Sequence, residues 1–474
     1  MTGNHFTERV AAQCAPLVPA RSTILIGLSG GVDSAVLLHL LQQLAPRFSW
    51  RLSALHVHHG ISPNADAWAN FCAGLCAGYA IPLHVEHVDI APLRQHGIEA
   101  AARKLRHAAF AKQPCDFVAL AHHTDDQAET LLLQLLRGAG VKGASAMPML
   151  ARREDSPNLL RPLLHISRRE ILDYAAAHGL RWIEDESNAD DGYPRNFLRH
   201  RALPLLERKF PACRTTLARS AQHFAEASEL LDDLARLDAA PAICDDTLAV
   251  VALQALTRPR ARNLLRYFLH SIGAPMPQAV QLDDMLCQLC GARQDAAVCV
   301  EYGGWEVHRY QGRVYALLAT GGFDRGLVMP WQGEAELDWP ALNVRLIFEP
   351  MRGRGISLEK LQRAPATLRL RQGGETLRPH PNAATRTLKN MLQEHHIPPW
   401  QRDRLPLLYC GDELACVAGV AVAAEYQANM GEMAIQVSLT YRARCFQAAA
   451  AEAFDGFEVG RDSPGIGRRL PYVR

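Results

Sequence analysis

The residues with the clearest chemical potential form the segment Ser29-Gly30-Gly31-Val32-Asp33-Ser34. This segment lies between an apolar run typical of a strand, Ile24–Leu28, and a run with helical periodicity, Ala35–Leu44. Two glycines allow a tight turn whose backbone approaches a ligand closely, and the amide groups at the start of a helix attract anions. We therefore predict a phosphate-binding loop formed by Ser29, Gly30, Gly31, Val32, Asp33 and Ser34.

Asp33 is an unusual neighbour for a phosphate, because two anions repel each other. A bound Mg²⁺ that bridges carboxylate and phosphate oxygens would remove this conflict, so we predict Asp33 as a catalytic residue and metal ligand. The chain contains no GxxxxGK[ST], and the loop at residues 29–34 does not fit GxGxxG, which favours capture of pyrophosphate over transfer of a γ-phosphate. The alternative is a plain glycine-rich turn with Ser and Asp as helix caps.

A second candidate segment follows the apolar run FVALA. Thr124 is a natural N-cap, Gln127 three residues later completes a capping box, and Gly138 is a typical helix stop. The first turns of this helix would carry the acids Asp125, Asp126 and Glu129, next to His123 at the end of the strand.

Two arginines, Arg103 and Arg106, would share a face of a helix predicted over Glu99–Lys112. Acids and arginines in one pocket suit an amino-acid substrate, because carboxylates hold ammonium groups and an arginine fork holds a carboxylate. A carboxylate can also accept the proton of an attacking amine. The alternatives remain that the acids only favour the helix dipole and that the arginines are solvated surface.

Histidines and cysteines offer weaker signals. We expect the histidines of HVHHG, including His58, to face a ligand rather than a metal, with a plain strand end as the alternative. Two close cysteine pairs lack the further ligands of a zinc site, so we predict buried core thiols. These pairs are Cys72 with Cys76 and Cys287 with Cys290.

A charged segment near residue 190 combines acids and arginines. Arg195 and Arg199 are four apart, so on a helix they project together. They would contact a phosphate or a base, or pair with Asp185 and Asp190 in a purely structural network. Asn188 lies between these acids.

Strand-like and helical patterns alternate over residues 22–150, which predicts an α/β domain with a doubly wound parallel sheet. Ligands of such sheets bind at the carboxyl ends of the strands. We predict a catalytic domain over 1–215, a mainly helical middle domain over 216–335, a small α+β domain over 336–442, and a poorly ordered tail over 443–474.

The composition is that of a globular protein, with 48% hydrophobic residues and a formal net charge of only +2. The near-neutral charge does not exclude a nucleic-acid partner, because only one face needs to be basic. We find no apolar run that would span a membrane and no signal-peptide pattern, so we expect a cytoplasmic protein without a membrane partner.

The loop SGGVDS resembles the pyrophosphate loop of the N-type ATP pyrophosphatases (the PP-loop family), which split ATP into AMP and pyrophosphate while adenylating a carbonyl oxygen. One branch of this family, the tRNA(Ile)-lysidine synthetases, is similar to this chain in further strings: HVHHG, EAAARKLR, HHTDDQAET, DESNAD and RNFLR. The resemblance implies ATP and Mg²⁺ as cofactors, with His58 near the nucleotide. It also implies free L-lysine and a tRNA(Ile) with a CAU anticodon as substrates.

In that reaction the C2 carbonyl oxygen of the wobble cytidine is adenylated, and the ε-amine of lysine then displaces AMP. The implied catalytic residues are Asp33, Asp125, Asp126, Glu129 and Arg195. The implied substrate-binding residues are Arg103, Arg106, His123, Asp125, Glu129, Asp185, Asn188 and Arg199.

The stretch 369–389 carries basic residues against one acid, Glu375. Basic side chains neutralise RNA phosphates, so we predict tRNA contacts from Arg369, Arg371, Arg378, Arg386 and Lys389. The alternative is an ordinary solvated loop. Two other functions stay open: a tRNA thiolase, which would need reactive cysteines near the loop, and an inactive tRNA-binding relative. The choice between monomer and homodimer is also open.

Overall fold

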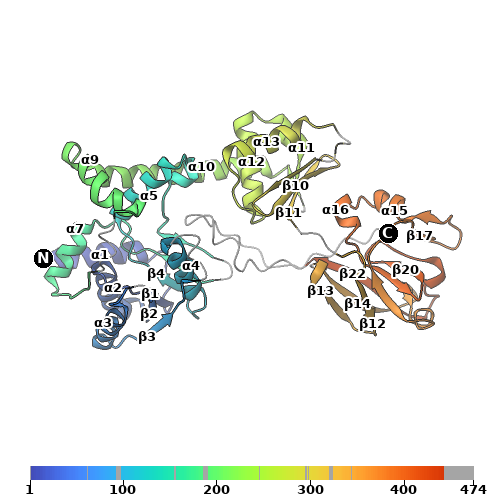
Figure 1. The fold of residues 1–474 in the computed structure, drawn as a ribbon, viewed down its shortest axis with the longest axis horizontal. Coiled ribbons are helices and arrows are strands. Elements are labelled where there is room, and N and C mark those ends of the chain that lie inside the picture. Colours follow the sequence, from blue (N-terminus) through green and yellow to red (C-terminus); the bar gives the residue numbers. More distant parts are fainter. Residues whose placement is uncertain are drawn as a thin grey trace. The chain divides into compact units, whose positions relative to one another are not determined.

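The computed structural model describes residues 2–60, 62–91, 98–153, 156–184, 191–244, 246–293, 296, 298–319, 324–342 and 344–441. The chain divides into two compact units with main spans Met1–Ala240 and Pro241–Gln447, coloured blue to green and green to red in Figure 1. Asp185, Asn188, Asp190 and the predicted tail over 443–474 lie outside the described residues. The predicted three-domain bounds stay predictions.

The first unit is built on a six-stranded sheet with the order β3-β2-β1-β4-β6-β5. Neighbouring strands are parallel except for the β5–β6 pair, which confirms the predicted α/β fold. Because the chain passes from β3 at one edge to β4 beside β1, the strand order reverses between β1 and β4, where ligands bind in such sheets. The strands are β1 (Thr23–Gly27), β2 (Arg51–His58), β3 (Leu83–His87), β4 (Phe117–Ala119), β5 (Leu150–Ala151) and β6 (Asn158–Leu160).

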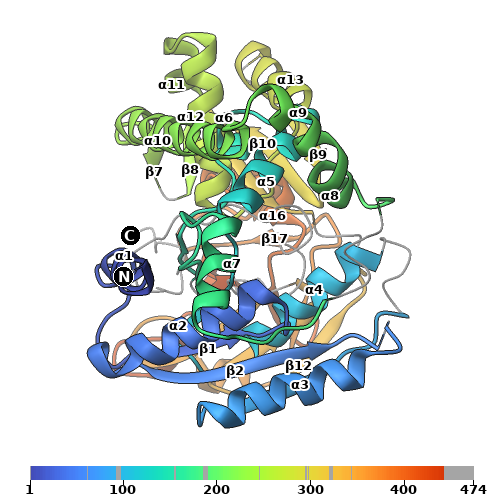
Figure 2. The same cartoon turned by 90° about the vertical axis from the view of Figure 1, so that its left-hand side faces the viewer.

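Both faces of this sheet are covered, which explains why its strands are apolar throughout. Ile24 and Ile26 pack into a core with α2 and α3, whereas Leu25 packs into a second core with Phe110 of α4. Figures 1 and 2 show α2 and α3 on one face and α4 on the other. The helical elements of the unit are α1 (Thr2–Cys14), α2 (Val32–Phe48), α3 (Ala65–Gly78), α4 (Ile98–Ala111), α5 (Thr124–Leu136), α6 (Val141–Ala144), α7 (Arg168–Ala177), α8 (Pro194–Phe197), the π-helical turn η3 (Leu198–Ala202), α9 (Leu203–Lys209) and α10 (Cys213–Ala239).

Helix α5 begins one residue earlier than its predicted cap implies. His123 is the N-cap, and its backbone N–H donates to the Asp126 carboxylate at 2.9 Å. The side chain of Gln127 instead exchanges hydrogen bonds with the backbone of Met147, at 2.8 and 2.9 Å. The predicted capping box of Thr124 and Gln127 is therefore wrong, because tertiary contacts engage Gln127. The predicted stop is confirmed by Gly138, whose φ is +74° just after the helix.

The first part of the second unit combines helices with a five-stranded sheet of order β7-β8-β11-β10-β9. Three strands of this sheet follow one another along the chain: β9 (Val298–Tyr302), β10 (Trp305–Tyr310) and β11 (Arg313–Leu318). The other elements are β7 (Ile243–Cys244), β8 (Thr247–Ala249), α11 (Val250–Ala255), α12 (Arg258–Ser271) and α13 (Ala279–Gly291). Cys287 on α13 is exposed, so its predicted burial is wrong; Cys72 and Cys76 are buried as predicted.

The rest of the second unit is rich in strands. A five-stranded sheet, β12-β16-β19-β20-β21, and a four-stranded sheet, β13-β14-β22-β15, share one apolar core. The elements are β12 (Val328–Trp331), β13 (Glu336–Trp339), η4 (Pro340–Leu342), β14 (Val344–Arg352), β15 (Ile356–Ser357), α14 (Leu358–Leu361), β16 (Ala366–Arg369), β17 (Thr376–Leu377), β18 (Arg386–Thr387), α15 (Leu388–Glu394), α16 (Pro399–Arg402), β19 (Leu407–Cys410), β20 (Glu413–Val417), β21 (Ala421–Val422), η5 (Ala424–Tyr426) and β22 (Met433–Tyr441). Within the described part of the chain, no helix has the length and apolar character needed to cross a membrane.

Candidate functional site

The loop between β1 and α2 requires glycine at its first turn position. Gly30 has φ of +89°, a conformation that other residues rarely adopt. A Cβ atom at this position would lie 2.5 Å from Cδ1 of Ile183. Gly31 differs, because it is the N-cap of α2 with φ of −70°. The close packing of Gly30 against Ile183 therefore fixes the path of the loop into the helix.

The hydroxyl groups of Ser29 and Ser34 form hydrogen bonds within the loop. Ser34 is buried, and its Oγ accepts from the Gly30 N–H at 3.1 Å and donates to the Gly31 carbonyl at 2.9 Å. The Gly31 N–H points to Oγ of Ser29 at 3.4 Å. The two glycine amides thus have partners within the loop. The N–H groups of the first turn of α2, at Val32, Asp33 and Ser34, have no partner within a helix, and groups of this kind suit an anion.

Asp33 is paired with an arginine that the sequence analysis missed. One Nη atom of Arg168, on α7, lies 2.9 and 3.1 Å from the two carboxylate oxygens of Asp33. The Nε2 atom of the buried His123 lies 3.7 Å from Asp33. A sequence signal for Arg168 exists, because Ser167 and Glu170 form an S-x-x-E capping box soon after the short strand β6.

Two acids of α5 form a buried ion-pair cluster with arginines of α8 and η3. Arg195 donates through Nε to Glu129 at 2.7 Å and through Nη2 to Asp126 at 2.8 Å. Arg199 donates to the other Glu129 oxygen at 2.7 Å and to Asp126 at 3.2 Å. The Glu129 side chain is fully buried, at 0% exposure. The predicted residues thus come together, but the carboxylates face arginines rather than an open pocket.

The charges around the cluster keep the Asp126 carboxyl group ionised. Burial by itself would raise the pKa of Asp126, but His123 and Arg195 outweigh it and hold that pKa well below its usual range. Asp125 belongs to the same network, since its carboxylate lies 3.1 Å from the Arg214 guanidinium on α10 and accepts from the Arg168 N–H at 3.2 Å. Arg214 is a second residue that the sequence analysis missed.

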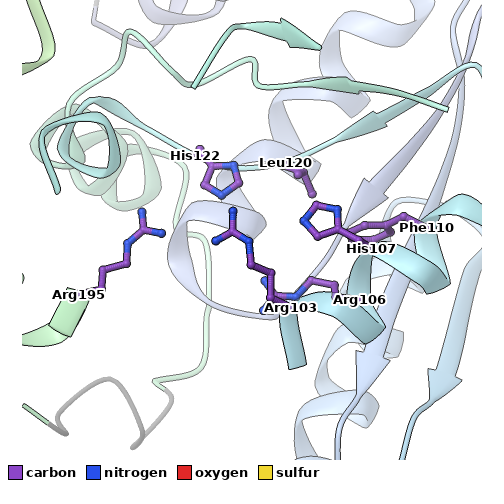
Figure 3. Close-up of a pocket in the computed structure, with 7 residues that line it drawn as sticks. All are labelled: Arg103, Arg106, His107, Phe110, Leu120, His122 and Arg195. Carbon is purple, nitrogen blue, oxygen red and sulfur yellow. The ribbon is translucent and has the colours of Figure 1, made fainter. Parts of the chain in front are cut away.

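Beside this cluster lies a small cavity of about 130 Å³. Figure 3 shows that the guanidinium ends of Arg103 and Arg195 lie on the side of the cavity where His122 is found. Of the predicted residues, Arg103, Arg106 and Arg195 line it, whereas Asp125, Asp126 and Glu129 do not. The remaining lining residues, which were not predicted as site residues, are His107, Phe110, Leu120 and His122.

The histidines at this cavity are neutral at neutral pH. Burial, followed by the charges of Arg103, Arg153, Arg106 and Arg161, lowers the pKa of His107 to about 3. Burial likewise places the pKa of His122 well below its usual range. The buried Nδ1 of His122 has no hydrogen-bond partner among the described residues. A cavity with three arginines and neutral imidazoles is suited to a small anionic group.

His58 lies at the carboxyl end of β2, as predicted, but its Nε2 is 3.0 Å from the Asp66 carboxylate. Its ring lies against that of His87, with centroids 4.5 Å apart. His56 is buried, and its Nδ1 lies 2.9 Å from the Leu28 carbonyl. The structure therefore supplies protein partners for His56 and His58, and a contact of His58 with a nucleotide stays a prediction.

The predicted basic stretch of the second unit is largely neutralised. Arg369, Arg371, Arg378 and Arg386 each lie beside a carboxylate, at 2.5 to 3.8 Å, and Lys389 is exposed. The acids are Asp412, Glu375 with Asp403, Glu425 and Glu394. All but Glu375 lie outside 369–389, so the count of a single acid within that stretch missed them. Glu394 ends α15, Asp403 follows α16, Asp412 precedes β20 and Glu425 lies in η5.

The sheet order and the loop at the start of α2 place the chain in the class of PP-loop proteins. The family model of the PP-loop domain matches residues 3–206. Those of the TilS substrate binding domain and the TilS substrate C-terminal domain match residues 248–315 and 366–439. The chain belongs to the tRNA(Ile)-lysidine synthase family.

Close full-length relatives support this placement. The tRNA(Ile)-lysidine synthase of Nitrosomonas europaea is 43% identical over 435 residues, which cover 91% of this chain and 94% of the relative. That of Escherichia coli O157:H7 is 40% identical, with 85% and 93% covered. Among solved structures, a U34-tRNA thiolase from Methanococcus maripaludis is 19% identical, covers 48% of this chain and 80% of its own, and has a TM-score of 0.41. That likeness is too low to support an inference on activity.

Proposed function

We propose that this enzyme ligates free L-lysine to C2 of the wobble cytidine of a tRNA(Ile) with a CAU anticodon and splits ATP into AMP and pyrophosphate. The observation that carries this proposal is the adjacency of two sites within one unit. A helix start that suits phosphates follows β1, and a cavity lined by Arg103, Arg106 and Arg195 adjoins the cluster that follows β4.

In the first step, the C2 carbonyl oxygen of the cytidine attacks the α-phosphorus of ATP, and the bond to pyrophosphate breaks. The amides of Val32, Asp33 and Ser34 would bind the phosphates, and the dipole of α2 would stabilise their charge. A wobble base lies in a single-stranded loop and is accessible to an enzyme.

Asp33 fits a magnesium ion by donor type, because Mg²⁺ in nucleotide sites takes one or two carboxylates together with phosphate oxygens. The Asp33 carboxylate lies at the phosphate loop and is only partly buried, with 28% of its side chain exposed. The ion would neutralise charge on the phosphates. Binding would require Asp33 to loosen its pairing with Arg168.

In the second step, the ε-amine of lysine attacks C2, AMP leaves with the former carbonyl oxygen, and the amine releases a proton. We propose that the arginine-lined cavity holds the α-carboxylate of lysine through Arg103 and Arg106. Glu129 and Asp126 then act as positioning residues, because they hold Arg195 and Arg199 in place. Catalysis is achieved mainly by positioning and charge neutralisation.

The thiolase alternative finds little support in the cysteines. Cys72 is near the phosphate loop, but burial raises its pKa to about 12. Cys76 is also buried, with a pKa raised to about 11 for the same reason. Buried thiols of this kind are inert, and a Cys→Ser series should leave activity intact.

The test is incorporation of labelled lysine into tRNA(Ile) with a CAU anticodon in the presence of ATP and Mg²⁺. We expect incorporation that depends on ATP and stops when the anticodon is changed to GAU. The Asp33→Ala variant should abolish pyrophosphate release and retain tRNA binding in a filter assay. Folded protein that incorporates no lysine into a competent transcript would overturn the proposal.

A further inference from the structure

The backbone of Arg168 is held beside the phosphate loop by hydrogen bonds at the start of α7. Arg168 is the first residue of α7, whose N-cap Ser167 accepts from the Glu170 N–H in a capping box. The Arg168 N–H itself donates to Asp125 at 3.2 Å. The guanidinium end is less constrained, since 43% of the side chain is exposed. The backbone is thus fixed while the charged end can change partner.

The present partner of Arg168 is Asp33, the carboxylate that we propose as the Mg²⁺ ligand. The guanidinium contacts both oxygens of Asp33, which sits in the first turn of α2 beside the amides that suit phosphates. Without a counter-charge, a carboxylate at this position would repel the polyphosphate. A polyphosphate carries several negative charges, and the planar guanidinium matches phosphate oxygens in a two-pronged geometry.

We propose that Arg168 is a phosphate-binding residue that exchanges partners. In the nucleotide-free enzyme it neutralises Asp33; when ATP enters, its guanidinium contacts the polyphosphate, and the Asp33 carboxylate becomes available to Mg²⁺. During adenylation the same positive charge stabilises the departing pyrophosphate. This inference rests on the proposed function only for the identity of the nucleotide, because the exchange itself concerns phosphate binding.

The exchange predicts opposite changes in two measurable quantities. In Arg168→Gln, ATP affinity measured without Mg²⁺, tRNA or lysine should fall at least about tenfold, because a charged contact with the phosphates is lost. The Mg²⁺ concentration needed for half-maximal nucleotide binding should decrease, because Asp33 no longer has a competing partner. Pyrophosphate release with tRNA should fall by roughly 10²-fold, as for loss of one transition-state donor.

Arg169 provides the matched control, since it is the next residue on α7 and is exposed. Arg169→Gln should leave nucleotide affinity, Mg²⁺ dependence and pyrophosphate release within about twofold of the wild type. Arg168→Lys should recover part of the ATP affinity, because it keeps the charge but not the fork. Circular dichroism melting of all three variants shows whether they are folded.

Unchanged ATP affinity in folded Arg168→Gln, or an increased Mg²⁺ requirement, would overturn the exchange. If Arg168→Gln fails to fold, the Arg168→Lys variant decides: wild-type ATP affinity and wild-type Mg²⁺ dependence together would refute it. Failure of the proposed function is distinguishable, because a wild-type enzyme that binds ATP but incorporates no lysine would refute the ligation and leave the exchange standing.

Discussion

At the scale of single residues, the two glycines of the phosphate loop look equivalent in the sequence but differ in the structure. Only Gly30 has a positive φ, and only there does a Cβ atom collide with a side chain, that of Ile183. The nearest contact of a Cβ at Gly31 is Oγ of Ser29 at an ordinary 3.6 Å.

Gly30→Ala should therefore reduce the free energy of unfolding by about 1–3 kcal/mol, the usual cost of forcing a non-glycine residue into such a conformation. Gly31→Ala should change it by less than about 0.5 kcal/mol. Urea denaturation of both variants measures the difference. Equal stability of the two variants would show that the backbone of the loop adjusts at no cost.

The pairing of charged residues is also decided at this scale. The sequence predicted which residues belong to the ion-pair cluster better than it predicted which of them pair with one another. Asp126, Glu129, Arg195 and Arg199 were all predicted as site residues, and they meet. Arg168 was missed, because its contact with Asp33 joins residues 135 positions apart.

At the scale of elements, the buried cluster fastens α5 to α8 and η3. Without the Glu129 charge, the two arginines would share Asp126 as their remaining partner in the cluster, and breaking a buried ion pair commonly costs about 3–5 kcal/mol. Glu129→Gln should therefore reduce the free energy of unfolding by several kcal/mol, as measured by urea denaturation.

The matched control is Asp233→Asn on α10. Asp233 pairs with Arg236 at the surface, and both side chains are more than half exposed, at 61% and 51%. Its loss should cost less than about 1 kcal/mol. If Glu129→Gln is as stable as this control, the cluster does not hold the helices together.

Elements with a strong periodic pattern were predicted well. The strands β1 and β4 and the helices α2 and α4 fall on the predicted segments to within a few residues. Short elements were not: β6 has only three residues and carries no periodicity, so its junction with α7, where Arg168 lies, was overlooked. The cap of α5 was misplaced because the Gln127 side chain satisfies the Met147 backbone, a contact that local sequence cannot reveal.

At the scale of the whole molecule, stability should depend on pH through neutral histidines of the first unit. The pKa of His107 is lowered to about 3 and that of His59 to about 4, in both cases mainly by burial. In the unfolded chain such groups take up protons near pH 6.5. Below that pH the unfolded state binds more protons than the folded state, so stability falls as the pH falls.

Between about pH 6 and pH 4, His107 should remove roughly 1.4 kcal/mol of stability per pH unit, and the contribution of His59 should fade as the pH approaches 4. Hydrogen exchange of the full-length chain, analysed separately for residues 1–240 and 241–441, measures where the loss occurs. His107→Asn should flatten the pH dependence of the first unit and leave that of the second unit unchanged. A slope unaffected by this substitution would contradict the lowered pKa of His107.

The sequence alone determined the α/β class, the family with its PP-loop domain, and most members of the buried ion-pair cluster, because periodicity and short motifs are local properties of the chain. The tertiary structure alone decided which groups face one another. It turned Ser34 of the loop inward, paired the predicted acids with arginines and placed Arg168 on Asp33. It also brought Asp412, which precedes β20, and Glu425 of η5 to the basic stretch of the second unit. The reason is physical: a charge pair depends on the distance between side chains in space, and folding sets that distance independently of their separation along the chain.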